Sequence, residues 1–226
     1  MNYLLNIHTA TKTAMVSLSD ENKVLAFLSN NESKNHAAFL HTAIHHILQE
    51  NDISFSVLKA IGVTGGPGSY TGIRVGLATA KGLSYALKIP LVVCNTLEVM
   101  THAAIEKIHD KEGLYIPMID ARRMEVFTAV YDAVFNIAEP PSALILEENY
   151  PARFPPEKHL YFFGNGSEKL KKIIPVSTNI FFVNVDITPE SMAWFCWHKF
   201  SRQEVVNLAN SQPFYVKDFH TNSKNL

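Results

Sequence analysis

A glycine-rich segment between two apolar stretches constrains the fold of this chain most strongly. Residues 65–74 read Gly-Gly-Pro-Gly-Ser-Tyr-Thr-Gly-Ile-Arg, with a strand-like stretch before them at residues 60–64 and an apolar, helix-like stretch following at residues 71–87. At such a junction, backbone N–H groups and the helix dipole favour anions. The segment has neither the Gly-Lys-Ser/Thr end of a Walker A loop nor the GxGxxG spacing. Two interpretations stay open: a tight turn that needs the backbone freedom of glycine, or a contact for an anion or a nucleotide. The residues of such a contact would be Gly66, Gly68 and Ser69.

The helix predicted at residues 71–87 is apolar or small on almost every side. Arg74, Lys81 and Lys88 recur every seven residues and share one stripe. Small residues recur every four and form a shallow ridge that another helix can approach closely: Gly72, Gly76, Ala80 and Ser84. A helix of this kind must be covered on nearly all sides. The sheet of the chain itself covers only one face, so either a partner protein or neighbouring helices of the same chain cover the other.

A second helix is predicted at residues 35–50. Its core stripe consists of Ala37, Leu40, Ile44, Ile47 and Leu48. It also carries a histidine group: His36, His41, His45 and His46. His41 and His45 have the spacing of metal ligands on a helix, but no HExxH motif and no nearby carboxylate or cysteine completes a site. We therefore predict a surface or interface histidine pair and no metal.

The order of elements predicts two α/β lobes. Strands are expected at residues 3–7, 14–18, 24–28, 60–64 and 91–94, and Thr96 can cap a helix at residues 97–109. The pattern then restarts with strands at residues 115–120 and 125–131. Thr188 and Pro189 open a last helix that runs to about Phe200.

Two such lobes around a cleft follow the plan of the actin-like ATPase and sugar-kinase (ASKHA) superfamily, with duplicated ribonuclease-H-like lobes. The predicted boundaries are residues 1–110 for the N-terminal, partner-binding lobe and residues 111–226 for the C-terminal lobe. The last helix is a candidate to pack back on the first lobe, and residues 217–226 form a polar tail that is expected to fray.

The composition predicts a folded protein of the cytoplasm. The hydrophobic share is 47%, the charged share is 18%, and the formal net charge is −1. The strongest basic run, at Lys169, Lys171 and Lys172, is expected to be a solvated helix end, so a partner would hold most of any bound RNA. Cys94 and Cys196 form no CxxC and are expected to be buried thiols. The sequence predicts neither a signal peptide nor a membrane span.

One position after the first strand argues against phosphotransfer. Superfamily members that move phosphate place an acidic residue there, whereas this chain has His8. Imidazole does not replace a carboxylate as a hard-oxygen ligand for magnesium. Asp120 stands in the second turn, close to Arg122, Arg123 and Glu125, where it could also form surface ion pairs. We therefore predict no catalytic residue and no cofactor of the chain's own.

Four segments carry a resemblance to a known family. Val-Thr-Gly-Gly-Pro-Gly-Ser-Tyr-Thr-Gly-Ile-Arg-Val-Gly at residues 63–76 closely resembles the signature of the TsaB family, also called YeaZ. The similarity continues at residues 78–83, 95–98 and 119–122. A weaker echo is Gln-Pro-Phe-Tyr-Val-Lys at residues 212–217, where the family usually reads Pro-x-Tyr-Leu-Arg. The match covers most of residues 1–130 and is thin beyond them; His8 stands where the family often has Asp or Glu.

The resemblance implies a non-catalytic relative of TsaD that pairs with TsaD through the helices at residues 35–50 and 71–87. It implies that TsaD transfers threonylcarbamoyl to N6 of the adenosine beside the anticodon, in tRNAs that read codons beginning with A. The ATPase TsaE would reset the complex, tRNA would be bound mainly through the complex, and a nucleotide is a candidate at the junction with TsaD. The residues expected to face the partner are Phe39, Ala43, His46, Gly72, Arg74, Gly76 and Ala80.

Two alternatives remain. The first is an independent enzyme, either an actin-like ATPase or a glycoprotease-type hydrolase, which would need an acidic residue at position 8 or a nucleophile–base pair. The second is a homodimer that uses the same apolar helix at residues 71–87, and such a dimer could form in isolation even if the heterodimer is the working state.

Overall fold

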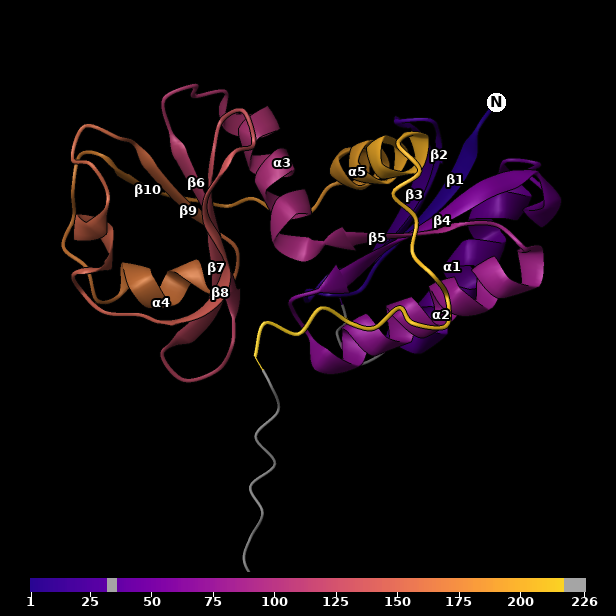
Figure 1. Ribbon diagram of the computed structural model, residues 1–226, viewed down its shortest axis with the longest axis horizontal. Coiled ribbons are helices and arrows are strands. Elements are labelled where there is room, and N and C mark those ends of the chain that lie inside the picture. The colour runs from indigo at the N-terminus through magenta and orange to yellow at the C-terminus, as the bar shows by residue number, and fades with distance from the viewer. Residues whose placement is uncertain (32–35, 218–226) are drawn as a thin grey trace, which may run out of the picture.

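Two five-stranded sheets organise the chain, and the computed structural model describes them within residues 1–31 and 36–217 (Figure 1). The first sheet, in lobe 1, consists of β1 (Tyr3–His8), β2 (Ala14–Asp20), β3 (Lys23–Asn30), β4 (Leu58–Gly66) and β5 (Leu91–Asn95). The second, in lobe 2, consists of β6 (Leu114–Asp120), β7 (Glu125–Asp132), β8 (Ile137–Ile145), β9 (Leu160–Phe163) and β10 (Ile180–Val183). The helices are α1 (His36–Glu50), α2 (Tyr70–Leu87), α3 (Thr96–Ile108), α4 (Ser167–Lys171) and α5 (Pro189–Ser201), with short 3₁₀ turns η2 (Phe55–Val57) and η3 (Tyr150–Arg153).

The two sheets have the same strand topology. Their orders are β3-β2-β1-β4-β5 and β10-β9-β6-β7-β8. In the first sheet β1 pairs antiparallel with β2 and parallel with β4, and in the second β6 pairs antiparallel with β7 and parallel with β9. Strand β1 lies at the centre of its sheet, and its side chains from Leu4 to His8 are buried on both faces. This accounts for its almost unbroken apolar sequence.

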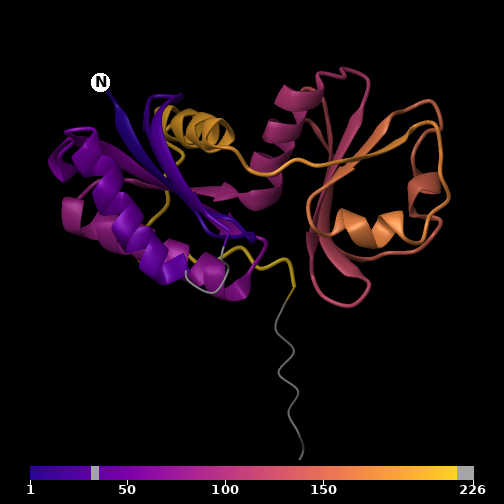
Figure 2. The ribbon, with the colours of Figure 1, turned by 180° about the vertical axis from the view of Figure 1, so that it is seen from behind.

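Helices cover both faces of the first sheet. Helices α1 and α2 lie side by side on one face, and α5 lies on the other (Figures 1 and 2). On the α1 side, side chains of the helix pack against the centre of β1. The helix contributes Leu40, Ile44 and Ile47, and the strand contributes Leu5 and Ile7. Although α5 comes last among the helices, it contacts β1, β2, β3 and β5 of lobe 1. The first lobe is therefore closed by a helix that follows the second sheet in sequence.

Helix α5 begins as the sequence predicts. Thr188 accepts a hydrogen bond from the N–H of Ser191, and the Ser191 hydroxyl caps the N–H of Thr188 in return, which forms a capping box. Pro189 occupies the first turn, where no intrahelical N–H is needed. Cys196 on α5 and Cys94 on β5 are free buried thiols with sulfurs 3.7 Å apart, which confirms the predicted burial.

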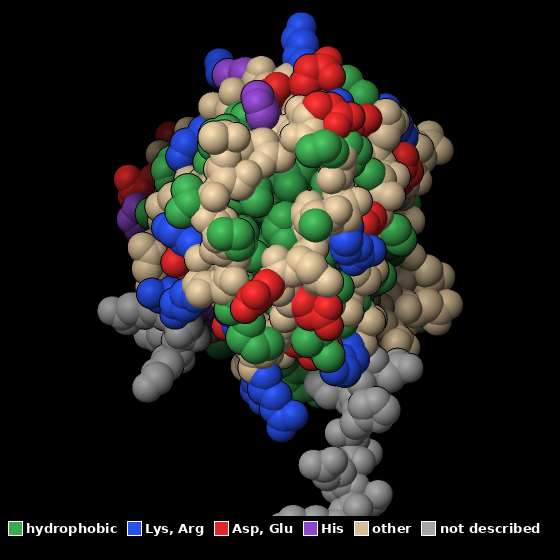
Figure 3. All heavy atoms as spheres, turned by 90° about the vertical axis from the view of Figure 1, so that its left-hand side faces the viewer, with side chains coloured by type: hydrophobic (Ala, Val, Ile, Leu, Met, Phe, Trp, Pro, Cys, Tyr) green, Lys and Arg blue, Asp and Glu red, His purple; other side chains and the backbone are tan. Residues whose placement is uncertain are grey.

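Lobe 2 is covered more thinly than lobe 1. Helix α3 lies between the lobes and packs on β6 (Figure 1). The other face of the second sheet packs against the five-residue α4 and against η3, around Phe162, Leu170 and Tyr150. Hydrophobic side chains gather on this end of the molecule (Figure 3). Within residues 1–31 and 36–217, no helix combines the length and apolar character that crossing a membrane requires.

The structure corrects several details of the predicted elements. On α1, Ala37 is exposed and Ala43 takes its place in the core, because the buried stripe is offset from the predicted one. Asn95, not Thr96, caps α3: its side chain accepts from the N–H of Leu97 at 2.9 Å. The sequence analysis did not predict β8, β9 or β10, and it predicted of α4 only a helix end at residues 169–172. Residues 35 and 218–226, which fall in the predicted first helix and tail, lie outside the described residues.

Candidate functional site

The glycine-rich turn between β4 and α2 is held by the turn between β1 and β2. The N–H of Ser69 donates to the carbonyl oxygen of Ala10 at 2.7 Å, and the Ser69 hydroxyl caps the N–H of Gly72 at 3.2 Å. Gly68 has a φ of 152°, and a β-carbon there would collide with the Ala10 carbonyl. Only glycine permits this conformation and approach. The turn thus serves the packing of the chain itself.

This packing tests the predicted anion contact at Gly66, Gly68 and Ser69. Gly66 is buried, and the carbonyl of Phe214 lies where its side chain would be, so Gly66 is not available to a ligand and that part of the prediction is wrong. Gly68 and Ser69 line an open cleft, although the amide and hydroxyl of Ser69 already have partners in the chain. An anion contact at these two residues stays a prediction.

The small-residue ridge of α2 faces the inside of the molecule. Gly72, Gly76 and Ala80 are buried. The hydroxyl of Thr9 donates to the carbonyl oxygen of Gly72 at 2.7 Å and lies directly over Gly76. The prediction that these three residues face a partner is wrong, because Thr9 and Val63 of the same chain cover Gly72 and Gly76, and Ala80 is buried in the core of lobe 1. Ala43 of α1 is likewise buried in the core, at 2% exposure.

Helices α1 and α2 lie side by side (Figure 2), and we call their outward, exposed residues the α1–α2 face. Its exposed residues are Ala37, Ala38, His41, Thr42, His45 and His46 of α1 and Arg74, Ala78, Gly82, Tyr85 and Ala86 of α2. Tyr85 is 79% exposed, and the space beside Gly82 is open. Of the residues predicted to face a partner, His46 and Arg74 are exposed here, and Phe39 is half-buried at the edge. Arg74 is the charged residue of this set, and the half-buried Lys81 lies on the same stripe of α2 with its Nζ on the carbonyl oxygen of Ser211. Ala78, Gly82 and Ala86 form a shallow strip of small side chains beside that stripe.

The histidines of α1 do not converge with other metal-ligating groups. His41, His45 and His46 are exposed on the α1–α2 face, whereas the buried His36 contacts the carbonyl oxygen of Lys12 through Nε2 at 3.2 Å. No group of three or more His, Cys, Asp or Glu side chains that could hold a metal ion occurs in the described parts of the chain.

His8 is part of the protein interior. Its Nδ1 lies 3.0 Å from the hydroxyl of Thr64, and its Nε2 lies 2.8 Å from the hydroxyl of Thr11. Burial, with a smaller contribution from the charge of His36, lowers the pKa of His8 to about 3. The imidazole is therefore neutral at physiological pH. It connects the end of β1 with β4 and with the β1–β2 turn.

Asp120, where β6 ends and the β6–β7 turn begins, makes its side-chain hydrogen bonds within lobe 2. Its carboxylate accepts from Nζ of Lys169 at 2.8 Å and from the N–H of Arg122 at 2.6 Å. Burial alone would raise the pKa of Asp120, but these hydrogen bonds and charges outweigh it and hold the pKa below its ordinary value. Lys169 is consequently a partly buried ion-pair partner and not the solvated helix end that the sequence analysis expected.

A cleft of about 730 Å³ lies between the β4–α2 turn of lobe 1 and the β6–β7 turn of lobe 2. The segment at residues 214–217 forms its third wall and joins the lobes, because Nζ of Lys217 contacts both carboxylate oxygens of Glu125 at 2.9 and 3.0 Å. Above the cleft, the guanidinium carbon of Arg74 lies 3.9 Å from the ring centre of Tyr70, and its Nε donates to the hydroxyl of Tyr215 at 2.9 Å.

Sequence reasoning missed Tyr70, Tyr215 and Lys217 as parts of a site. The available signal was the weak family echo at residues 212–217, which the structure places beside the glycine-rich turn. A second, smaller cleft of about 360 Å³ lies between the β1–β2 turn and the β9–α4 turn. Its lining includes Thr11, Lys12, Asn165, Lys171 and Asp186.

Comparisons with known proteins find two related families, TsaD by the family model and TsaB by the curated relatives. Residues 27–194 match the model of the family described as TsaD, tRNA N6-adenosine threonylcarbamoyltransferase. The chain is 32% identical over 174 residues to the TsaB protein of Bacillus subtilis, named a tRNA threonylcarbamoyladenosine biosynthesis protein, with 76% of this chain and 74% of the relative covered. It is 27% identical over 190 residues to TsaB of Buchnera aphidicola subsp. Baizongia pistaciae, covering 80% of this chain and 84% of the relative.

The solved structures show that the fold is shared. YeaZ from Pseudomonas aeruginosa superposes with a TM-score of 0.81 and 22% identity, covering 95% of this chain and all of the other. A Pseudomonas aeruginosa protein described as similar to peptidase YeaZ superposes with a TM-score of 0.84 and 22% identity, covering 96% of this chain and all of the other. With the sequence match to Bacillus subtilis TsaB, these findings show that the chain belongs to the TsaB (YeaZ) family.

Proposed function

We propose that this chain is a non-catalytic scaffold that binds TsaD and supports it in the modification of tRNA. TsaD would transfer threonylcarbamoyl to N6 of the adenosine beside the anticodon, in tRNAs that read codons beginning with A. The names of the relatives place the family in the biosynthesis of threonylcarbamoyladenosine. The observation that carries the scaffold role is the α1–α2 face, which is exposed on the lobe with the family signature and presents mainly small, histidine and tyrosine side chains beside the cationic stripe of Arg74.

The proposal that the chain is not itself an enzyme is supported by the two turns that face the lobe boundary. His8 is neutral and held by two threonine hydroxyls, so it offers no hard oxygen ligand. Asp120 is already paired with Lys169. Neither residue is free to act as the acidic group that an actin-like ATPase needs.

The α1–α2 face is the proposed docking site for TsaD. Exposed apolar area without charge is typical of the centre of a protein interface. Tyr85 would be an anchor because it is large and 79% exposed, and Gly82 and Ala78 would let a partner helix approach closely. His46 and Arg74 stay in the proposed interface from the sequence analysis, whereas the buried Ala43, Gly72, Gly76 and Ala80 leave it.

Further partners follow from the same proposal. A nucleotide at the junction with TsaD would meet Gly68 and Ser69 at the start of α2, and the chain would have no cofactor of its own. TsaE would reset the complex by ATP hydrolysis. A homodimer through the α1–α2 face is expected when TsaD is absent, because the same apolar surface would then be exposed. A tRNA substrate would place the complex in the cytoplasm.

We also infer that the lobes are duplicated copies of a ribonuclease-H-like unit in the actin-like (ASKHA) arrangement. The inference is supported by the identical strand order and pairing of the two sheets. A glycine-containing turn also follows the fourth strand of each sheet and leads into a helix, at Gly66 and Gly68 in lobe 1 and at Gly164 and Gly166 in lobe 2. This would make the chain a relative of TsaD that kept the fold without the chemistry.

Two assays test the proposed function. The first measures threonylcarbamoyl transfer to tRNA by TsaD with and without this chain, and we expect transfer to depend on the chain. The second measures ATP hydrolysis by the purified chain alone, and we expect none above background. An independent ATPase or hydrolase would be favoured if the chain alone hydrolysed ATP and if TsaD transferred threonylcarbamoyl equally well without the chain.

A further inference from the structure

Arginine is concentrated at one place on this protein. The sequence has five arginines, at positions 74, 122, 123, 153 and 202. Three of them, Arg74, Arg122 and Arg123, lie at the cleft between the β4–α2 and β6–β7 turns or directly above it. The planar guanidinium group is especially suited to binding phosphate. The clustering of three arginines therefore indicates a phosphate-bearing ligand, although the net charge of the chain is close to zero.

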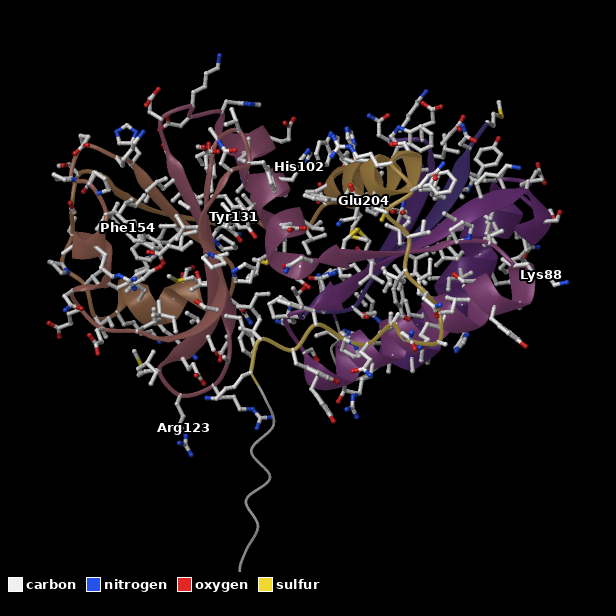
Figure 4. All side chains as sticks on the ribbon, in the orientation of Figure 1. Lys88, His102, Arg123, Tyr131, Phe154 and Glu204 are labelled. Atoms are coloured by element: carbon white, nitrogen blue, oxygen red, sulfur yellow. The ribbon has the colours of Figure 1, made fainter. Side chains whose placement is uncertain are left out.

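The two arginines of the β6–β7 turn line the cleft and are exposed to solvent. Arg122 and Arg123 are exposed at the tip of the turn, and Figure 4 shows Arg123 extending outward from lobe 2. Both have left-handed backbone conformations, with φ of 71° and 46°. The acidic residues of the cleft have cationic partners, since Asp120 pairs with Lys169 and Glu125 pairs with Lys217. No ion pair of the Arg122 or Arg123 side chain occurs within residues 1–31 and 36–217.

Aromatic planes stand on the other side of the same cleft. The rings of Tyr70 and Tyr215 are stacked with centres 5.9 Å apart, and Arg74 is held against both. Tyr70 is 42% exposed. A cleft with arginine forks on one wall and a tyrosine–arginine stack on the other offers phosphate contacts and a stacking surface within one opening of about 730 Å³.

We propose that this cleft binds the phosphodiester backbone and an unstacked base of RNA, so that the chain itself contributes to holding the tRNA substrate. This rests on the proposed function for the identity of the RNA. Proteins recognise single-stranded RNA by combining cations that follow the backbone with aromatic or guanidinium planes on which bases stack. An acidic peptide would use the arginines but would leave the tyrosine stack without a role.

The test compares RNA binding by matched variants. Fluorescence anisotropy measures binding of a labelled anticodon stem–loop RNA to the complex of this chain with TsaD, and to this chain alone at high concentration. The double variant Arg122→Gln/Arg123→Gln should bind RNA roughly 5- to 20-fold more weakly at 0.15 M salt, and its dependence of log K on log salt should be shallower by about 1.5. Arg153→Gln/Arg202→Gln removes the same charge elsewhere and should leave both unchanged. Tyr70→Ala should weaken binding without changing the salt slope.

The outcomes separate this proposal from the proposed function. If the chain forms no complex with TsaD, the scaffold proposal fails, and the measurement on the chain alone still decides whether the arginines bind RNA. Equal affinity and salt slope for the wild type and the Arg122→Gln/Arg123→Gln variant would overturn the RNA site. The RNA site would also be overturned if the Arg122→Gln/Arg123→Gln variant bound polyglutamate or ATP more weakly but bound RNA as tightly as the wild type. The cleft would then bind an acidic peptide or a nucleotide.

Discussion

The hydroxyl of Thr9 donates a 2.7 Å hydrogen bond to the carbonyl oxygen of Gly72, and the same side chain fills the space beside Gly76. This contact locks the β1–β2 turn onto the start of α2. It explains why small residues recur every four along this helix: they admit the chain's own backbone and side chains. The face of α2 that remains for a partner is the opposite one, around Gly82 and Tyr85.

Two glycine substitutions on α2 should have opposite effects on stability. Gly76→Arg places a long cation in the packed layer over Thr9, and we expect a loss of more than ~3 kcal/mol or a failure to fold. Gly82→Arg puts the same side chain in open space and removes a helix-interior glycine, so stability should rise by about 0.5–1 kcal/mol. Thermal unfolding followed by circular dichroism measures both. Equal stability of the two variants would contradict the assignment of the buried and exposed faces.

Tyr85 should contribute to TsaD binding far more than to folding. Tyr85→Ala removes a side chain that is 79% exposed, so the midpoint of unfolding should hardly change. If Tyr85 is an interface anchor, the free energy of TsaD binding should weaken by about 2 kcal/mol, which is a roughly 30-fold rise in Kd by calorimetry. The control is Val176→Ala, a fully exposed apolar residue in lobe 2. An unchanged Kd for Tyr85→Ala would remove Tyr85 from the interface.

His8 should make the protein less stable in mild acid. The unfolded chain takes up a proton at this side chain near pH 6.5, whereas burial keeps the pKa in the folded protein at about 3. The contribution of His8 to the free energy of unfolding is therefore fully present above pH 6.5, and it declines as the pH falls toward 3. Between pH 7.5 and pH 5 the decline should be about 2 kcal/mol. Urea unfolding of the wild type and of His8→Asn at both pH values measures this decline. The free energy of unfolding of the variant should fall correspondingly less between the two pH values. The same decline in both proteins would show that His8 is protonated in the folded protein.

The ion pair between Lys217 and Glu125 should link the lobes only weakly. Both contacts, at 2.9 and 3.0 Å, are partly exposed to solvent. A double-mutant cycle with Lys217→Met and Glu125→Gln should give a coupling energy below about 1 kcal/mol that decreases as salt is raised. A coupling of several kcal/mol, or one that salt leaves unchanged, would mean that the pair is essential to lobe closure.

Much of lobe 1 could be predicted from sequence because its elements have strong local signals. The alternating and continuous apolar runs of β1 to β5 indicate strands, and Thr188 with Pro189 marks the start of α5, which packs on this lobe. In lobe 2, β9 and β10 have four residues each, which is too short for a clear period. Strand β8 contains Pro140 and Pro141, which a sheet tolerates because β8 is an edge strand.

The candidate site was harder to predict because it depends on which face of a helix is buried. The ridge at Gly72, Gly76 and Ala80 looked like a partner surface, since spacing alone does not distinguish the chain's own turn from another protein. The sequence drew attention to His8, but its contacts could not be predicted, because Thr64 lies 56 residues away on another strand and Thr11 lies in the turn. Tyr215 and Lys217 reach the cleft only because the segment after α5 runs back along α2 (Figure 1).

The most direct test of the central claim is the mass of the complex between this chain and TsaD, measured by size-exclusion chromatography with light scattering. We predict that the wild type and Gly82→Ala form a stable complex with TsaD, and that the folded Gly82→Arg variant elutes separately from it because arginine blocks the α1–α2 face. A complex of normal mass and yield with Gly82→Arg would contradict the account.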